Sequence, residues 1–197
     1  EKTTNVATNK TETDGAYPLT VTDASGTEMT IEKEPERIIS MIPSNTEILF
    51  ELGLNEEIIA VTDIDDYPAE AVEKEKIGAM EFDFEKIISL TPDVVFSHES
   101  AMGVSEAGIE QLRAAGIDVF VVEDAKNFEH TYETIYDIAE ITNTTEQADT
   151  IVADMKEQVA DIQEKLADVE PKRVFIEISD APEIYTAGSN TFTDEML

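Results

Sequence analysis

The sequence contains no cysteine and no tryptophan, and it has only two histidines among 197 residues. Without cysteine there can be no disulfide, thiolate metal site or cysteine nucleophile. His98 and His130 are too few to build a histidine-rich metal cluster. No apolar stretch approaches the roughly 20 residues that cross a membrane as a helix. These absences exclude particular kinds of site, but they are compatible with a folded α/β domain.

Basic residues are also scarce, with 13 Lys and Arg against 45 Asp and Glu and a formal net charge of −32. Such a surface repels nucleic acid phosphates and anionic lipids, so we expect neither as a partner. The acidity is interpreted either as a solvated surface suited to salty or alkaline surroundings, or as a patch that meets a basic protein. Apolar residues make up 41% of the chain and can form a core.

Common catalytic motifs are missing as well. The sequence has no Gly-x-Gly-x-x-Gly, no phosphate-binding loop and no Gly-x-Ser-x-Gly elbow. The segment DIDDYP (63–68) supplies three carboxylates, Asp63, Asp65 and Asp66, but it lacks the glycine and distant Glu of a calcium-binding loop. We therefore expect no enzyme activity, no metal site and no cofactor, and we interpret these aspartates as a solvated rim that caps the loop and its turn.

Short apolar runs alternate with helical patterns along most of the chain. Residues 18–32 predict a β-hairpin around Asp-Ala-Ser-Gly, and Ser44 with Glu47 predicts a capping box. Strands are expected at 38–42, 58–62, 93–97 and 117–122, and helices at 45–52, 84–90, 105–115 and 128–142. This alternation predicts an α/β fold with an open, mainly parallel, Rossmann-like sheet. Ligands of such sheets bind outside the carboxyl ends of the strands, where PSN (43–45), DIDDYP and SHES (97–100) lie.

The chain divides into four predicted parts. Residues 1–16 are polar and predict a flexible tether, and residues 17–143 predict an N-terminal α/β lobe. Asn143 and Glu146 are expected to cap a long helix over 144–169. A strand at 173–178 and a helix start at 191–197 follow. Because residues 172–197 are too few to form a core alone, we expect them to begin an incomplete second α/β lobe.

Several of these segments resemble one family. The runs RIISMIPSNTEILFELGL (37–54), VTDIDDYP (61–68) and FEKIISLTPDVV (84–95) resemble the substrate-binding proteins of ABC importers for vitamin B12, ferric siderophores and haem. IPSNTEILFELGL and DYPAEA (66–71) are most similar to the cobalamin-binding branch. The resemblance, over about residues 18–197, implies two α/β lobes joined by one long helix, small lobe movements, and a corrinoid or ferric chelate bound between the lobes.

The resemblance also implies where the protein works. It implies an extracytoplasmic protein that delivers its ligand to an ABC permease, more in keeping with a Gram-positive cell-surface lipoprotein than with a periplasmic protein. Residues 1–16 resemble the linker that follows a lipidated cysteine, and this anchor would be the only membrane contact. The edge of the strand at 173–178 predicts that the fragment self-associates. An acidic extracellular binding or scaffold domain and a carboxylate-dependent enzyme remain as alternatives.

The first candidate ligand residues lie at two strand ends. The resemblance aligns Tyr67 with an aromatic residue that contacts the ligand, and its flat face and hydroxyl suit a large macrocycle. The alternative for Tyr67 is packing on the lobe surface. Pro43 either lines the cleft or only begins a helix, and Ser44 either contacts the ligand or caps that helix.

The remaining candidates lie in two further loops and one helix. Where the cobalamin-binding branch has a tryptophan, the stretch GAMEFDF (78–84) offers Met80, Glu81 and Phe82, which keeps ferric complexes among the possible ligands. His98 and Glu99 follow a strand and are either ligand contacts or surface residues. The resemblance aligns Glu85 with a glutamate that docks onto permease arginines, although Glu85 also suits a helix start.

Overall fold

A five-stranded parallel sheet forms the centre of the protein. The structure, a computed structural model, describes residues 17–170, 172–179 and 181–197. The strand order is β5-β4-β3-β6-β7, and every neighbouring pair is parallel. The strands are β3 (Ile38–Ser40), β4 (Ile58–Val61), β5 (Glu75–Lys76), β6 (Val94–His98) and β7 (Asp118–Val122). The predicted α/β fold with an open parallel sheet is confirmed.

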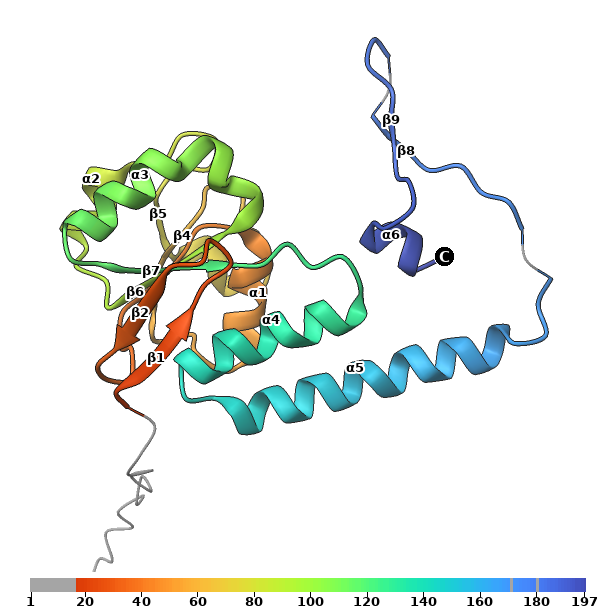
Figure 1. Cartoon of the computed structure of the whole chain (residues 1–197), viewed down its shortest axis with the longest axis horizontal. Coiled ribbons are helices and arrows are strands. Elements are labelled where there is room, and N and C mark those ends of the chain that lie inside the picture. The colour runs from red at the N-terminus through yellow and green to blue at the C-terminus, as the bar shows by residue number, and fades with distance from the viewer. Residues whose placement is uncertain (1–16, 171, 180) are drawn as a thin grey trace, which may run out of the picture.

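Helices cover both faces of this sheet (Figure 1). They are α1 (Pro43–Glu51) and α4 (Phe128–Ile141) on one face, and α2 (Phe84–Ser89) and α3 (Met102–Ala114) on the other. Successive strand residues point to opposite faces, so Ile38 packs with Leu49 of α1 whereas Ile39 packs with Ile109 of α3. Because both faces are buried, the strands are continuous apolar runs. The predicted element bounds agree with the structure to within a few residues.

Two predicted capping boxes are wrong. Helix α1 begins at Pro43, its N-cap residue is Ile42, and no side chain caps it. Proline suits the first helical position because it has no N–H to leave unpaired there, so Ser44 lies inside the helix and cannot cap it. Likewise α5 (Thr145–Leu166) follows Thr144 as N-cap residue, because Asn143 adopts a left-handed conformation with a φ of 57°.

One buried carboxylate fixes the N-terminal hairpin to the sheet. The hairpin, confirmed as predicted, pairs β1 (Leu19–Thr22) with β2 (Glu28–Ile31). In its turn, the Asp23 side chain is fully buried and accepts hydrogen bonds from the backbone N–H groups of Ser25 and Thr27, each at 2.9 Å. Its Oδ2 accepts from the Arg113 guanidinium at 2.6 Å and from the Val121 N–H at 3.2 Å. Asp23 thereby joins the hairpin to both α3 and β7.

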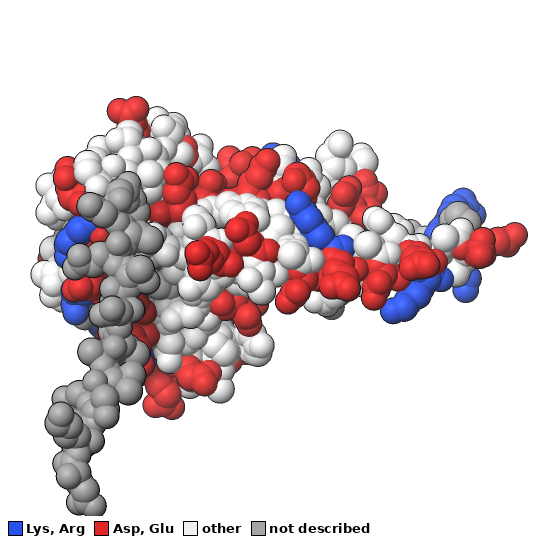
Figure 2. Space-filling view, turned by 90° about the horizontal axis from the view of Figure 1, so that it is seen from below, with Lys and Arg blue, Asp and Glu red and all other residues white. Residues whose placement is uncertain are grey.

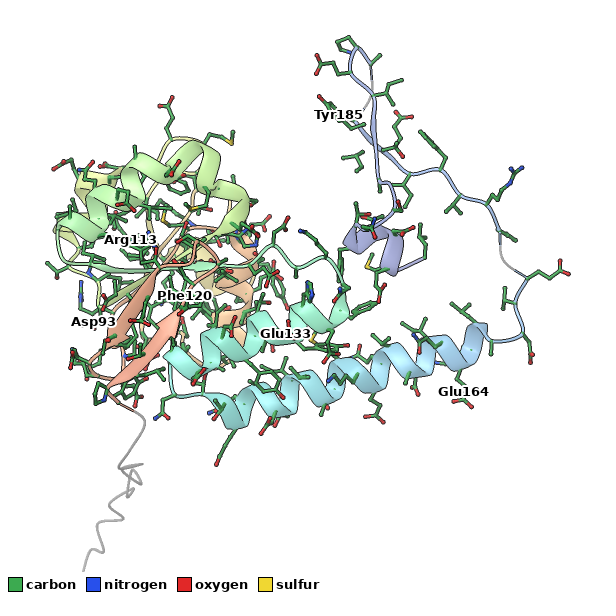
Figure 3. All side chains as sticks on the ribbon, viewed as in Figure 1. Asp93, Arg113, Phe120, Glu133, Glu164 and Tyr185 are labelled. Carbon is green, nitrogen blue, oxygen red and sulfur yellow. The ribbon has the colours of Figure 1, made fainter. Side chains whose placement is uncertain are left out.

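Beyond the sheet, α5 lies along α4 and then extends past it (Figure 1). Its buried residues, Ala148 and Val152, lie in its first half. Three short elements follow, namely β8 (Glu177–Ser179), β9 (Tyr185–Thr186) and α6 (Phe192–Glu195). Figure 3 shows Glu164 on α5 and Tyr185 on the β8–β9 hairpin, both away from the sheet. The helix α6 returns to α4, where the Phe128 and Phe192 ring centroids are 5.2 Å apart.

The strand predicted at 173–178 is wrong in its extent. Residues 173–176 are irregular, and β8 begins only at Glu177. It pairs with β9 as an antiparallel hairpin instead of extending a sheet. The tether predicted for residues 1–16 lies outside the described residues. The division into a first lobe, a connecting helix and the start of a second lobe stays a prediction.

Acidic side chains are spread over the sheet region and along the projecting helix (Figure 2). Few basic side chains separate them on this face. In the described ranges, no helix is long and apolar enough to cross a membrane. The same residues contain no group of three or more His, Asp or Glu side chains placed to hold a metal ion.

Two glycines of α3 provide a matched stability test. The Phe84 ring of α2 packs against α3, and a methyl group at Gly108 would overlap this ring. A methyl group at Gly103 would meet nothing within 4 Å. We expect Gly108→Ala to lower the free energy of unfolding by about 1–3 kcal/mol through overpacking. Gly103→Ala should raise it by about 0.5 kcal/mol, because the unfolded chain loses freedom. Urea denaturation measures both, and equal effects would contradict the close α2–α3 packing.

A second pair of variants tests the Asp23 contact. Asp23→Ala leaves Arg113 and three backbone N–H groups without their shared acceptor, so the free energy of unfolding should fall by about 3 kcal/mol. Glu110 is the other acidic partner of Arg113, and its side chain is 66% exposed. Glu110→Ala should therefore change the free energy of unfolding by less than about 1 kcal/mol. Urea denaturation that found similar losses for both would exclude Asp23 as the anchor of the hairpin.

Candidate ligand-binding edge

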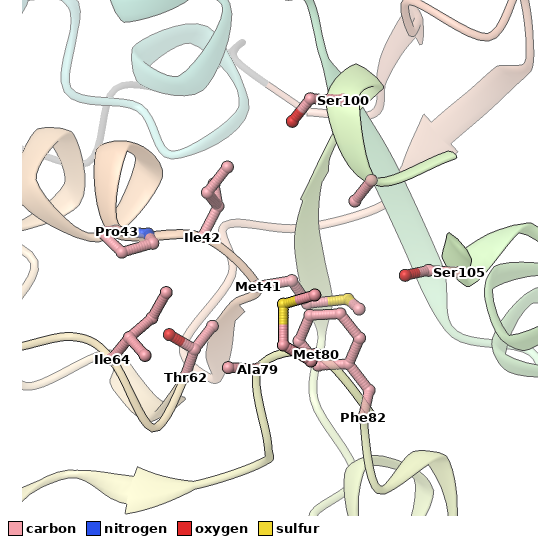
Figure 4. A pocket seen from close by; sticks show the side chains of 11 residues that line it. Met41, Ile42, Pro43, Thr62, Ile64, Ala79, Met80, Phe82, Ser100 and Ser105 are labelled. Atoms are coloured by element: carbon pink, nitrogen blue, oxygen red, sulfur yellow. The ribbon is translucent and has the colours of Figure 1, made fainter. Parts of the chain in front are cut away.

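The loops after β3, β4 and β6 enclose a hollow of about 230 Å³ at the carboxyl edge of the sheet (Figure 4). We call it the apolar hollow, because most of its side chains are hydrocarbon or thioether groups. It is lined by Met41, Ile42, Pro43, Thr62, Ile64, Ala79, Met80, Phe82, Ser100, Ala101 and Ser105. Figure 4 shows Ile42, Ile64, Met80 and Phe82 gathered around it, the last two from one loop. Such a surface suits the flat or curved apolar body of a ligand.

A second hollow of about 430 Å³ adjoins it on the side of β7 and α4. We call it the acidic hollow. It is lined by Ile42, Ser44, Asn45, Ile48, His98, Ser100, Val122, Glu123, Asp124, Ala125, Thr131, Thr134 and Phe192. Ile42 and Ser100 line both hollows, so the two lie next to each other along one edge. The buried Asn45 side chain donates to the Ser97 carbonyl at 2.9 Å, which fixes the start of α1 against β6.

Two aspartates of DIDDYP cap the loop and its turn as predicted, but the interpretation as a solvated rim is wrong for Asp65. That side chain is buried, and its Oδ2 accepts from both the backbone N–H, at 2.8 Å, and the hydroxyl of Thr62. Its carbonyl oxygen accepts from the Lys76 ammonium at 3.2 Å. Asp63 is exposed but exchanges two hydrogen bonds with the backbone of Gly78, each at 3.2 Å. Only Asp66 is an exposed rim residue without such a bond among the described contacts.

The loop before α2 forms the outer wall of the apolar hollow. Gly78 has a φ of 89°, and a Cβ there would overlap the Glu81 carbonyl, so the turn requires glycine. Met80 lies at the tip with 81% of its surface exposed, while Phe82 is half-buried against Phe84. The Asp83 side chain accepts from the Lys86 N–H at 2.9 Å and caps α2. The wall is thus a rigid turn that presents one exposed thioether.

His98 ends β6 at the margin of the acidic hollow. It is half-buried, and its Nδ1 accepts from the Ser100 N–H at 3.2 Å in the 3₁₀ helix η2 (Glu99–Ala101). Burial lowers its pKa below the usual value, although the carboxylates of Asp124 and Glu99 act in the opposite direction. The Glu99 side chain accepts from the Asp124 N–H at 3.1 Å, so it joins η2 to the loop after β7.

The predicted site residues fall into three groups. Pro43, Met80 and Phe82 line the apolar hollow. Ser44 and His98 line the acidic hollow. The third group, Tyr67, Glu81 and Glu99, is exposed and lines neither of these two hollows.

Several residues that line the hollows were not among the predicted site residues. Ile42 directly precedes Pro43 at a strand end, so its position was a usable signal, and Ser100 lies within SHES. Thr62 and Ile64 flank Asp63 at the next strand end, where the sequence indicated only the aspartates and Tyr67. Ser105 lies inside α3 and gave no signal.

Glu85 lies in the first turn of the short helix α2 and is exposed. Its Oε1 accepts from the Gln111 side chain of α3 at 3.0 Å. The carboxylate is therefore oriented by a neighbouring helix, and its other oxygen has no described partner. The position in the first turn also suits the positive end of the helix dipole.

Comparison with known proteins identifies the family of this chain. The profile of the periplasmic binding protein family matches residues 38–197. YvrC of Bacillus subtilis, an ABC transporter substrate-binding lipoprotein, is 46% identical over 194 residues, and the match covers 97% of this chain and 61% of YvrC. The chain thus spans less than two thirds of this relative.

Solved structures agree with the profile. A possible iron-binding (periplasmic solute-binding) protein of Staphylococcus epidermidis has a TM-score of 0.77 at 38% identity, covering 83% of this chain and 64% of that one. The periplasmic vitamin B12 binding protein BtuF of Vibrio cholerae has a TM-score of 0.70 at 26% identity, covering 82% and 62%. With its matched profile, parallel sheet and hollowed carboxyl edge, this chain belongs to the periplasmic binding protein family.

Proposed function

We propose that the protein is the substrate-binding component of an ABC importer and binds a corrinoid or a ferric chelate. The observation that carries this proposal is the pair of adjacent hollows at the carboxyl ends of β3, β4 and β6, in a chain of the periplasmic binding protein family. The proposal takes the importer role from YvrC and the two ligand classes from the relatives of Vibrio cholerae and Staphylococcus epidermidis.

The rim of the apolar hollow supports a large ligand. Ile64 and Met80, which line this hollow, are 63% and 81% exposed, so two large apolar side chains are left in water. Exposed apolar groups that gather around a hollow are typical of binding sites. A macrocycle or a bulky chelate would cover both, whereas a small ion or sugar would leave them exposed. Tyr67, which is 59% exposed and follows Ile64 by three residues, would be a further contact of the same ligand.

The wider organisation is part of the same proposal. Residues 17–143 would form the first lobe, residues 144–169 the connecting helix, and residues 172–197 the start of a second lobe that closes the ligand site. By analogy with the lipoprotein YvrC, the protein would be extracytoplasmic and anchored at the cell surface by a lipid, with residues 1–16 as the linker. Its partners would then be its ligand and the transmembrane subunits of the permease.

Glu85 would contact the permease. Its exposed carboxylate is oriented by Gln111 and stands on a helix that lines neither hollow, so it could pair with an arginine while the ligand site is occupied. Contacts of this kind steer association and orient the partners.

Ligand binding tests the proposal directly. The full-length protein, titrated with cyanocobalamin, ferric haem and ferric siderophores, should bind at least one of them. Met80→Asp should weaken that binding by about tenfold or more, because it replaces an apolar contact at the rim by a charge. Val72→Asp is the matched control, since Val72 is 52% exposed but lines neither hollow. Absence of binding to every chelate would contradict the proposal.

The docking role of Glu85 needs a separate measurement. Glu85→Lys should leave ligand affinity unchanged but reduce uptake of the ligand by cells about tenfold, because a lysine would repel a permease arginine. Glu106→Lys makes the same charge change at an exposed position of the neighbouring helix α3 and should have little effect. Equal uptake by the two variants would remove Glu85 from the interface.

A further inference from the structure

We propose that His98 donates a hydrogen bond from its Nε2–H to an uncharged carbonyl oxygen of the ligand and does not coordinate the ligand's metal. This inference rests on the proposed function and deepens it, because it specifies which chemical group of the chelate meets the acidic hollow. Three observations support it, concerning the proton on the ring, the free nitrogen and the surrounding charge.

The backbone of η2 determines which ring nitrogen carries the proton. The Ser100 N–H donates to Nδ1 of His98 at 3.2 Å, and the Ser100 hydroxyl lies 2.8 Å from the same nitrogen. A backbone N–H can only donate, so Nδ1 must be the unprotonated acceptor. The neutral ring therefore carries its single proton on Nε2. Burial favours this neutral form by lowering the pKa of His98.

The protonated nitrogen is the one available to a ligand. No described residue accepts a hydrogen bond from Nε2, and His98 lines the acidic hollow. A histidine that binds a metal through Nε2 needs a lone pair there and donates its other N–H to an acceptor. His98 has the reverse arrangement, with a donor aimed at Nδ1. It is therefore set up to donate a hydrogen bond and poorly suited to coordinate iron or cobalt.

The charge around His98 selects the type of acceptor. Glu123 and Asp124 line the same hollow, Glu99 also acts on the ring, and no lysine or arginine is among the lining residues. A carboxylate of the ligand would meet the like charges of Glu123 and Asp124 in this hollow, which disfavours it. An uncharged carbonyl, such as a carboxamide, accepts the same hydrogen bond without this repulsion. The geometry thus favours a chelate with a neutral periphery at this point.

The tautomer can be tested without any ligand. Nitrogen-15 NMR of the histidine rings in the full-length free protein, at neutral pH, distinguishes the two neutral tautomers and the imidazolium. The ring signals that disappear in His98→Gln are those of His98, and His130→Gln identifies those of His130. We expect His98 to carry its proton on Nε2. A proton on Nδ1, or a charged ring at neutral pH, would overturn the inference whatever the protein binds.

The contact with the ligand needs matched variants of His98. For aquacobalamin, which carries carboxamides, His98→Phe should weaken binding about tenfold, whereas His98→Gln, which keeps an N–H donor, should stay within about threefold. His130 lines neither hollow, so His130→Gln is the matched control and should bind like the wild type.

The absorption spectrum of the bound metal separates donation from coordination. It should be the same for the wild type and His98→Phe, since no imidazole replaces the axial water. A spectral change that depends on His98, or affinity unaffected by His98→Phe, would overturn the inference. If the wild type binds no chelate, the proposed function fails and the carbonyl contact fails with it, while the NMR result still decides the tautomer.

Discussion

The common direction of the five strands determines where everything else in the molecule can lie. Because β3, β4 and β6 are parallel neighbours, the segments that follow them must emerge at one edge. Each return crossing then needs a helix, and the helices bury both faces of the sheet. These helices leave the carboxyl edge of the sheet open, and both hollows lie there. Residues 41–43, 62–64 and 98–101 meet there for this topological reason, although long stretches of chain separate them.

Local hydrogen bonds hold the loops at the carboxyl edge in place. Buried Asp65 binds its own strand end through Thr62, Asp63 binds the turn at Gly78, and Asn45 binds the end of β6. These bonds are local and mostly made to backbone groups, so each loop has little freedom left to lose on binding. Ordering a loop on binding reduces affinity, and a loop that is already ordered avoids that cost. The carboxylates of Asp63 and Asp65 are in this sense structural, and Ile64 between them lines the apolar hollow.

The sequence predicted the sheet well because its signal is redundant. Ile38 and Ile39 are both apolar, as are Val94 and Val95, and such pairs are typical of strands buried on both faces. Helix caps were predicted less well, because one residue such as Pro43 shifts a helix start and changes which side chain can cap it. Burial of Asp65 could not be predicted, since a cluster of aspartates has the same composition on a surface as in a folded loop.

The lining of the two hollows was predicted only in part, for a related reason. Strand ends are visible in a sequence, so Pro43 and His98 could be chosen as candidates. Which residues of a loop turn inward depends on backbone bonds that the composition does not reveal, and this is why Ile42, Ile64 and Ser100 were missed. The separation of the edge into an apolar and an acidic part depends on the loop after β7, which carried no recognised motif.

The length of α5 has a geometric consequence for whatever follows it. Its 22 residues form a rod about 33 Å long, and each residue turns the chain by about 100°. Inserting or deleting one residue would therefore move the following segment by only about 1.5 Å but swing it around the axis by more than a quarter of a turn. The helix thus sets a rotational phase as well as a distance. Insertions of three or four residues would come closest to preserving that phase, and single-residue changes would disturb it most.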